Sequence, residues 1–163
     1  AQASAEDLHS VDRRERQRGK RDRRVTGRVQ DLPPAVRAEL QRVMEATQAY
    51  TQGHLILALS YGGRSEIVDA VRAIAARVQA GALAPEKIDE AVIVRHLYPP
   101  DVPDPDLMIR TSGELRLSHF LLWELSYAEL YFTETLWPDF REPDFARALA
   151  EYARRRRRYG APA

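Results

Sequence analysis

The chain has 163 residues, of which 44% are hydrophobic and 30% charged, and its formal net charge is +1. This length is enough for one domain with a substantial core. The absence of cysteine excludes a disulfide framework and a thiolate metal site, and it makes a cytoplasmic protein the simplest expectation. No apolar run is long enough to cross a bilayer, so we expect any membrane contact to be peripheral, at the membrane surface.

Basic residues are concentrated near the beginning of the chain. Residues 12–28 contain nine Lys or Arg and three Asp or Glu. Such a block suits RNA or anionic lipid, but it contains no aromatic residue that could stack on a base. We therefore predict a basic, disordered N-terminal arm over residues 1–24 and a folded domain over residues 25–163. Nucleic-acid binding by the arm is kept as an alternative, although no nucleic acid is expected as a partner.

The first predicted elements follow Val25. Asp31 is a suitable cap for a helix that extends to about Gln52, with apolar residues at helical spacing. The continuous apolar run from Leu55 to Ser60 predicts a strand buried on both faces, as in a parallel sheet covered by helices.

A glycine turn and a second helix come next. Gly62 and Gly63 interrupt the strand, Ser65 is the predicted helix cap, and Gly81 lies beyond the predicted end. Four apolar residues recur on one face of this helix: Ile67, Val71, Ile74 and Val78. Strand, turn and helix in this order indicate an α/β fold.

The second half of the chain continues this pattern. Its predicted elements are a helix over 85–96, a stiff proline-rich connection, a short buried strand over 106–110, a polar loop over 111–119 and a last helix that starts near Pro143. The fold class is therefore α/β, with a mostly parallel sheet flanked by helices.

Arg110 and Arg116 lie at the end of the predicted strand and on the loop that follows it. Open α/β sheets bind ligands at this place. Ion-paired arginines at the edge of the core are the alternative interpretation. The segment Tyr61–Arg64, Tyr-Gly-Gly-Arg, is by itself only a weak phosphate signal, and the four histidines show no metal-binding spacing.

Three segments carry a resemblance to a known family: YGGR at Tyr61–Arg64, IRTSGELRLS at Ile109–Ser118, and FLLWELSYAELYFTETLWPDF at Phe120–Phe140. They closely resemble the cis-prenyltransferases, and in particular the undecaprenyl diphosphate synthases, also called isoprenyl transferases. The resemblance extends from about Val25 to Gly160.

The resemblance implies a homodimeric transferase that uses Mg²⁺ and no organic cofactor. Such an enzyme condenses isopentenyl diphosphate onto an allylic diphosphate, in cis, to make a polyprenyl diphosphate. It implies a metal-associated carboxylate at Glu129. The residues that it implies for substrate binding are Arg110, Arg116, Leu117, Ser118, Arg64, Arg158 and Gly160. Arg158 and Gly160 resemble an R-x-G element that reaches the neighbouring subunit, although Arg158 equally suits a helix-end charge.

The sequence also departs from the family pattern. Ser60 and His119 stand where family members usually have asparagine. The family's M-D-G-N-x-R-W loop, which carries the metal-binding aspartate, and its F-S-x-E-N-W segment have no counterpart here, so no catalytic residue is assigned. We expect an undecaprenyl diphosphate synthase-like fold that lacks its N-terminal strands, and little elongation of farnesyl diphosphate by this chain alone. A fragment, a shifted reading frame and a noncatalytic partner subunit are the alternatives.

Overall fold

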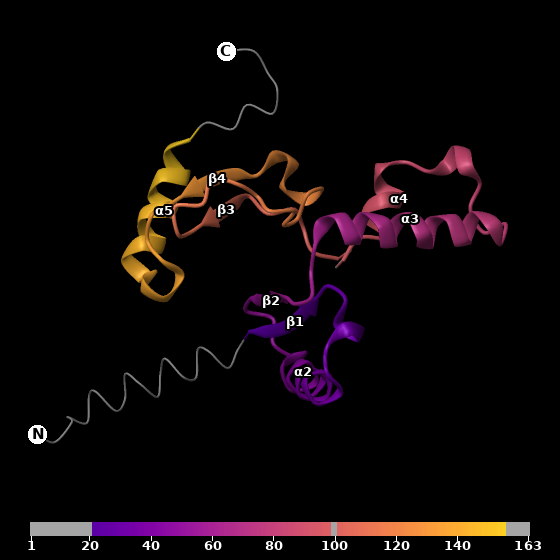
Figure 1. Cartoon of the computed structure of the whole chain (residues 1–163), viewed down its shortest axis with the longest axis horizontal. Coiled ribbons are helices and arrows are strands. Elements are labelled where there is room, and N and C mark those ends of the chain that lie inside the picture. Colours follow the sequence, from indigo (N-terminus) through magenta and orange to yellow (C-terminus); the bar gives the residue numbers. More distant parts are fainter. Residues whose placement is uncertain (1–20, 99–100, 156–163) are drawn as a thin grey trace, which may run out of the picture. The chain divides into compact units, whose positions relative to one another are not determined.

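The computed structural model describes residues 21–98 and 101–155. The chain divides into two units, with the boundary between Tyr61 and Gly62. Each unit contains a sheet of two parallel strands together with helices (Figure 1). The predicted α/β class with parallel strands flanked by helices is confirmed. No helix in the described part of the chain combines the length and the apolar character needed to span a bilayer.

The first unit is a strand–helix–strand arrangement. Strand β1 (Asp22–Thr26) is followed by a short 3₁₀ helix, η1 (Val29–Asp31), by helix α2 (Pro34–Thr47) and by strand β2 (His54–Ala58). The two strands are parallel, with Asp22 opposite His54. Parallel strands must be joined by a crossover connection, and α2 provides it.

Strand β1 corrects the predicted boundary between arm and domain, because it begins at Asp22 rather than after residue 24. Asp22 is only 6% exposed. Its Oδ2 atom accepts hydrogen bonds from Nε of Arg24 (2.6 Å) and from Nδ1 of His54 (3.1 Å). These partners let a charged sequence enter a sheet, which composition alone did not indicate. Residues 1–20 of the predicted arm lie outside the described residues.

Two details of the first unit differ from the sequence prediction. Helix α2 begins after Pro33 and ends at Thr47, five residues before the predicted end. Thr47 is buried, and its hydroxyl oxygen accepts a hydrogen bond from the Arg23 amide (3.0 Å). Strand β2 is not buried on both faces, since Leu55 is 47% exposed. Helix α2 packs mainly against β1, and it therefore shields β2 less from solvent within this unit.

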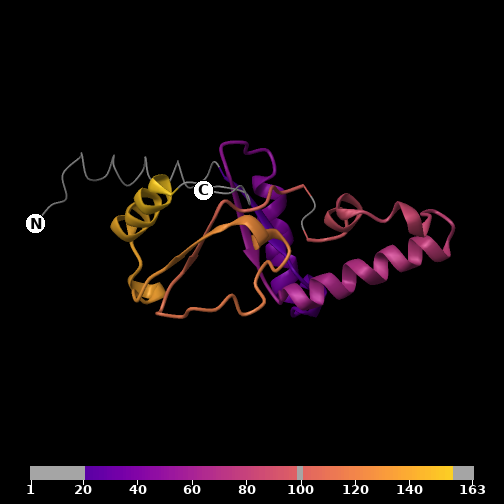
Figure 2. The same ribbon diagram turned by 90° about the horizontal axis from the view of Figure 1, so that it is seen from above.

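The second unit contains three α-helices, two strands and three short 3₁₀ helices in its described part. Their bounds are α3 (Gly63–Gln79), η2 (Pro85–Lys87), α4 (Glu90–Val94), β3 (Leu107–Arg110), η3 (Glu124–Tyr127), β4 (Glu129–Phe132), η4 (Trp137–Asp139) and α5 (Glu142–Arg154). Helix α4 packs against α3, as both views show (Figures 1 and 2), and α5 packs against β4. Strand β4 was not predicted, because its Glu-Leu-Tyr-Phe sequence lies inside a longer mixed segment.

The buried face of helix α3 matches the predicted apolar face only in part, at Ile74. The helix begins at Gly63 rather than at Ser65, and its buried residues are Gly63, Glu66, Ala70 and Ile74. Val71, which belongs to the predicted apolar face, is 59% exposed. Gly63 lies on the buried face, where the neighbouring loop approaches the helix closely. The predicted glycine after the helix is confirmed, with Gly81 at φ +70°.

The predicted helix over residues 85–96 is two separate elements. Ile88 is extended between η2 and α4. The Asp89 carboxylate accepts a hydrogen bond from the Val92 amide (2.8 Å) and so caps a new helix. Side-chain capping by Asp89 competes with a continuous helix. The last helix, α5, starts one residue before Pro143, close to the predicted position.

The buried apolar side chains among the described residues all lie in the second unit. They are Ala70, Ile74, Val92, Leu97, Met108, Leu125 and Ala148.

Candidate functional site

A pocket of about 360 Å³ opens at the carboxyl end of β3. It is lined by strand and loop residues together: Met108, Ile109, Arg110, Thr111, Ser112, Glu114, Leu117 and Phe120. Two predicted substrate-binding residues, Arg110 and Leu117, belong to this lining. A pocket that combines apolar walls with a few polar groups is the usual form of a small-molecule site.

Arg110 is the last residue of β3 and is half-buried. Its carbonyl oxygen accepts a hydrogen bond from the Thr133 amide (3.0 Å). Its guanidinium group makes no hydrogen bond or ion pair with the described residues. The alternative of an ion-paired arginine at the core edge therefore does not apply to Arg110 within the described part of the chain. A half-buried cation without a partner favours an anionic ligand in the pocket.

The first half of the loop is held by the segment that follows β4. The Ser112 amide donates to the Thr135 carbonyl (2.9 Å), and the Gly113 amide donates to the Thr133 carbonyl (2.9 Å). Both Ser112 (φ +68°) and Gly113 (φ +67°) adopt the left-handed conformation. A Cβ atom added to Gly113 would lie 2.5 Å from Oε2 of Glu134. The positive φ angle favours glycine at position 113, and the close approach of the Glu134 carboxylate adds to this preference.

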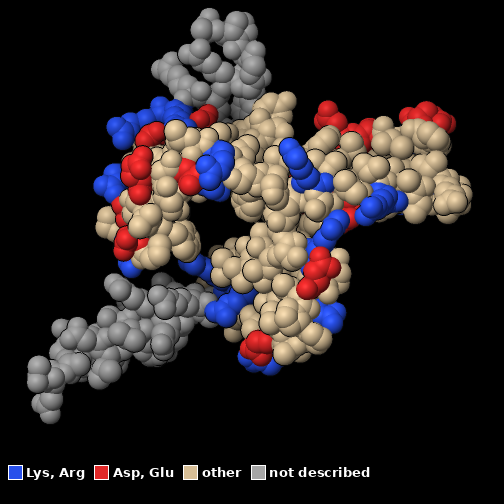
Figure 3. Space-filling view, viewed as in Figure 1, with Lys and Arg blue, Asp and Glu red and all other residues tan. Residues whose placement is uncertain are grey.

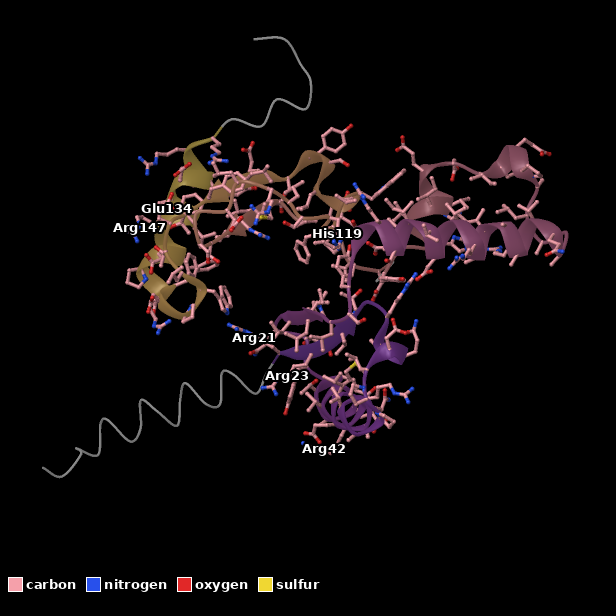
Figure 4. All side chains as sticks on the ribbon, viewed as in Figure 1. Arg21, Arg23, Arg42, His119, Glu134 and Arg147 are labelled. Atoms are coloured by element: carbon pink, nitrogen blue, oxygen red, sulfur yellow. The ribbon has the colours of Figure 1, made fainter. Side chains whose placement is uncertain are left out.

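The second half of the loop contacts the first turn of α3. The Gly63 amide donates to the His119 carbonyl oxygen (2.7 Å), and a Cβ atom on Gly62 would lie 2.8 Å from Cε1 of the His119 ring. Figure 4 shows His119 beside the beginning of α3. Ser118 and His119 both have positive φ angles, +50° and +52°. Non-glycine residues in this region are strained, and such residues cluster at functional sites.

The Tyr-Gly-Gly-Arg segment thus has a structural role that the sequence did not reveal. Its two glycines allow the loop to approach α3. Arg64, the second residue of α3, is exposed and has no partner among the described residues.

Basic side chains lie along α3, whereas acidic side chains lie over the η2–α4 segment (Figure 3).

The remaining predicted substrate-binding residues occupy other positions. Arg116 lies on the same loop, is 67% exposed and forms an ion pair with Glu114. Ser118 is exposed on the loop, and neither Arg116 nor Ser118 lines the pocket. Arg158 and Gly160 lie outside the described residues.

Glu129 lies at the opposite end of the small sheet from Arg110. In the β3–β4 register, Leu107 is opposite Glu129 and Arg110 is opposite Phe132. Three residues along a strand correspond to about 10 Å. The Oε2 atom of Glu129 accepts a hydrogen bond from Arg155 (2.9 Å). Arg155 donates hydrogen bonds to Glu151 and to Glu129. These bonds, the one to Glu151 more than the one to Glu129, raise the pKa of Arg155 above its ordinary value. In the described part of the chain, no group of three or more His, Asp or Glu side chains could hold a metal ion.

Sequence reasoning missed several residues of the site. Thr111, Ser112, Glu114 and Phe120 line the pocket but were not singled out. Glu124 is not part of the pocket lining, and burial is the main cause that raises the pKa of its carboxyl to about 7. The sequence signal that could have found these residues is the concentration of polar residues directly after a strand. This signal marks the ligand-binding edge of a sheet, but it does not say which residues line the pocket.

Comparison with known proteins relates the chain to one family. A family model described as "Putative undecaprenyl diphosphate synthase" matches residues 4–160, so the match begins well before Val25. A tritrans,polycis-undecaprenyl-diphosphate synthase (geranylgeranyl-diphosphate specific) of Methanopyrus kandleri is 49% identical over 137 residues, which are 84% of this chain and 51% of that protein. An isoprenyl transferase of Thermotoga maritima is 50% identical over 139 residues, covering 84% and 58%.

Solved structures give the same grouping. Lavandulyl diphosphate synthase from Lavandula x intermedia, in complex with dimethylallyl diphosphate, matches with a TM-score of 0.85 and 42% identity over 87% of this chain and 61% of that one. A probable undecaprenyl diphosphate synthase from Campylobacter jejuni matches with a TM-score of 0.76 and 33% identity, over 94% and 73%. The chain spans about half the length of the curated relatives it matches.

Proposed function

The chain belongs to the undecaprenyl diphosphate synthase family of cis-prenyltransferases, and from this premise we propose that it serves prenyl transfer. The reaction would condense isopentenyl diphosphate onto an allylic diphosphate, in cis, and yield a polyprenyl diphosphate. The observation that carries the proposal is the half-buried guanidinium group of Arg110, which lines the pocket and has no partner among the described residues.

The pocket has the chemistry that a short prenyl diphosphate needs. Arg110 offers a planar donor group that can bind two phosphate oxygens at once. Thr111 and Ser112 add polar groups beside it, and Leu117 and Phe120 provide apolar surface for a hydrocarbon group. Ionisation of an allylic diphosphate releases pyrophosphate, and fixed cations stabilise the negative charge that then develops.

Arg116, Ser118 and Arg64 are proposed as further diphosphate contacts. Arg116 is paired with Glu114, so an incoming diphosphate would compete with that carboxylate for the guanidinium group. The same role is proposed for Arg158 and Gly160.

Magnesium dependence belongs to the proposal, with Glu129 as the associated carboxylate. The described residues do not form a magnesium site by themselves. The Glu129 carboxylate is bound by Arg155, and no cluster of three ligating side chains occurs among the described residues. Isothermal titration of the chain with Mg²⁺, with and without isopentenyl diphosphate, would test this part separately. We also propose a homodimer in the cytoplasm with peripheral membrane contact.

Binding of isopentenyl diphosphate is the direct test of the pocket. We expect the chain to bind this ligand in isothermal titration and the Arg110→Gln variant to bind it at least about tenfold more weakly, because a charge-assisted hydrogen bond is lost. Arg37→Gln on α2 is a matched control with the same change in charge, and we expect it to bind normally. Equal affinity of the Arg110→Gln variant and the unaltered chain would refute the proposal. Incubation with labelled isopentenyl diphosphate and an allylic diphosphate then measures whether the chain elongates the allylic diphosphate.

A further inference from the structure

An apolar groove lies along α3, in a part of the second unit that the proposed diphosphate pocket does not include. Its volume is about 510 Å³. Side chains of α3 line one side of the groove, and residues of the η2–α4 segment line the other. Apart from Gln79 the lining is apolar, and its larger members are Val71, Ile74, Val78, Pro85, Ile88 and Ile93.

The groove is open to solvent. Val71 is 59% exposed and Ile88 is 40% exposed, although both line the groove. Val68, three residues before Val71 on the same side of the helix, is also exposed and extends the apolar surface. A contiguous exposed apolar surface that is rimmed by polar residues is typical of a protein–protein contact.

The α3 edge of this surface is basic. Arg64, Val68 and Arg72 follow one another at intervals of four residues and therefore form one row along the helix, beside Val71. Arg64 is exposed and has no partner among the described residues. The side chain of Arg72 is 73% exposed, and a guanidinium nitrogen lies 3.7 Å from the carboxylate of Asp69.

The opposite edge, on the η2–α4 segment, is acidic. Three acids, Glu86, Asp89 and Glu90, outnumber the single base Lys87. The Asp89 carboxylate caps α4 through the Val92 amide, whereas Glu86 and Glu90 are exposed and make no side-chain hydrogen bond or ion pair with the described residues. Figure 3 shows the basic and the acidic side chains on either side of an uncharged band.

A surface with this charge pattern is complementary to itself. When two copies face each other about a two-fold axis parallel to α3, the basic edge of each copy lies opposite the acidic edge of the other. The exposed aliphatic side chains then meet at the centre, and opposite charges meet on both sides. An unrelated partner would need the same two charged edges in reverse order, whereas a second copy provides them by symmetry.

We propose that this surface, formed by the exposed side of α3 and by the η2–α4 segment, is an interface between two copies of this chain. The interface gives the proposed homodimer a definite surface. It does not depend on prenyl transfer, because its residues are distinct from those that line the pocket at the end of β3.

Sedimentation equilibrium of the full chain tests the interface. We expect the unaltered chain to have the mass of two chains, and we expect Val71→Glu to dimerise at least about tenfold more weakly, because it places a charge in the apolar centre. Val71 is exposed, so the fold of this variant should be unchanged, which circular dichroism checks. Val36→Glu, the same substitution at an exposed valine of α2, should dimerise like the unaltered chain.

Charge reversal tests the two edges. Arg72→Glu and Glu90→Arg should each weaken the dimer, because each variant brings like charges together on both sides of the two-fold axis. An equimolar mixture of the two variants should associate more tightly than either variant alone, since opposite charges then face each other on both sides.

Three results would overturn the proposal. The first is a monomeric unaltered chain, which would leave the groove to a different protein. The second is a Val71→Glu variant that dimerises as tightly as the unaltered chain. The third is a mixture of the charge-reversed variants that associates no more tightly than the separate variants.

Discussion

The Gly63 amide and the His119 carbonyl oxygen are joined by a hydrogen bond of 2.7 Å, which connects the first turn of α3 to the loop after β3. These two residues belong to segments that are more than fifty positions apart in the sequence. The contact explains why glycine occupies the start of α3, and it places the loop that follows Arg110 against a rigid helix.

The first prediction concerns the close approach at Gly63. In Gly63→Ala, the added Cβ atom would lie 2.9 Å from the His119 carbonyl oxygen and 3.1 Å from the Leu122 amide nitrogen. Overpacking against backbone costs about 1–3 kcal/mol, which exceeds the gain of up to about 1 kcal/mol from removing a helical glycine. We expect a net loss in the free energy of unfolding, measured in urea. Gly53→Ala, where the Cβ atom would meet Arg21 at 3.7 Å, should change it little.

The second prediction separates two reasons for glycine at position 113. Gly113→Ala introduces both a positive φ angle at alanine and a contact of 2.5 Å with Oε2 of Glu134. The left-handed conformation costs a non-glycine residue about 1–2 kcal/mol, and the contact adds to this. Glu134→Ala should relieve only the contact, so that the double variant recovers part of the loss. A double-mutant cycle in urea measures this recovery. Full additivity of the two substitutions would show that Glu134 moves aside without cost.

The third prediction concerns the attachment of α5 to β4. Arg155 donates to the Glu129 carboxylate (2.9 Å) and to the Leu130 carbonyl (2.8 Å), and its side chain is 28% exposed. Arg155→Leu should lower the free energy of unfolding by about 1–3 kcal/mol, because Glu129 loses its charged partner. Arg154→Leu should cost less than about 0.5 kcal/mol, since Arg154 is exposed. Equal losses in these two variants would contradict a specific role for Arg155.

The fourth prediction concerns stability in acid. Hydrogen bonds from Arg24 and His54, of which the one from Arg24 is the stronger cause, hold the pKa of Asp22 below its ordinary value. A carboxyl group whose pKa is lower in the folded state stabilises the protein above its unfolded pKa, and this contribution is lost as the pH falls through the folded pKa. We expect Asp22→Asn to weaken the decrease in unfolding free energy between about pH 5 and pH 2. Asp31→Asn, at an exposed position in η1, is the control.

The local elements could be predicted where residue type and spacing suffice. The glycine after α3, the strand that ends at Arg110 and the start of α5 near Pro143 follow from capping, apolar runs and the backbone limits of Gly and Pro. The family could be predicted as well, because the residues from Asp106 to Phe140 form a distinctive pattern.

Elements held by distant partners could not be predicted in this way. Strand β1 begins inside a basic stretch because Asp22 finds Arg24 and His54. The helix predicted over 85–96 divides because the Asp89 side chain competes for a backbone amide. Strand β4 becomes visible only through its pairing with β3.

The sequence by itself determined the α/β class and the family, and it predicted Arg110 and its loop as a candidate site, since these depend on local patterns of residue type. Only the tertiary structure decided which residues of α3 are buried and that Glu129 is held by Arg155 at the far end of the β3–β4 sheet. The physical reason is that burial, charge pairing and close backbone approach are set by residues far apart along the chain, and helical or strand periodicity carries no information about such partners.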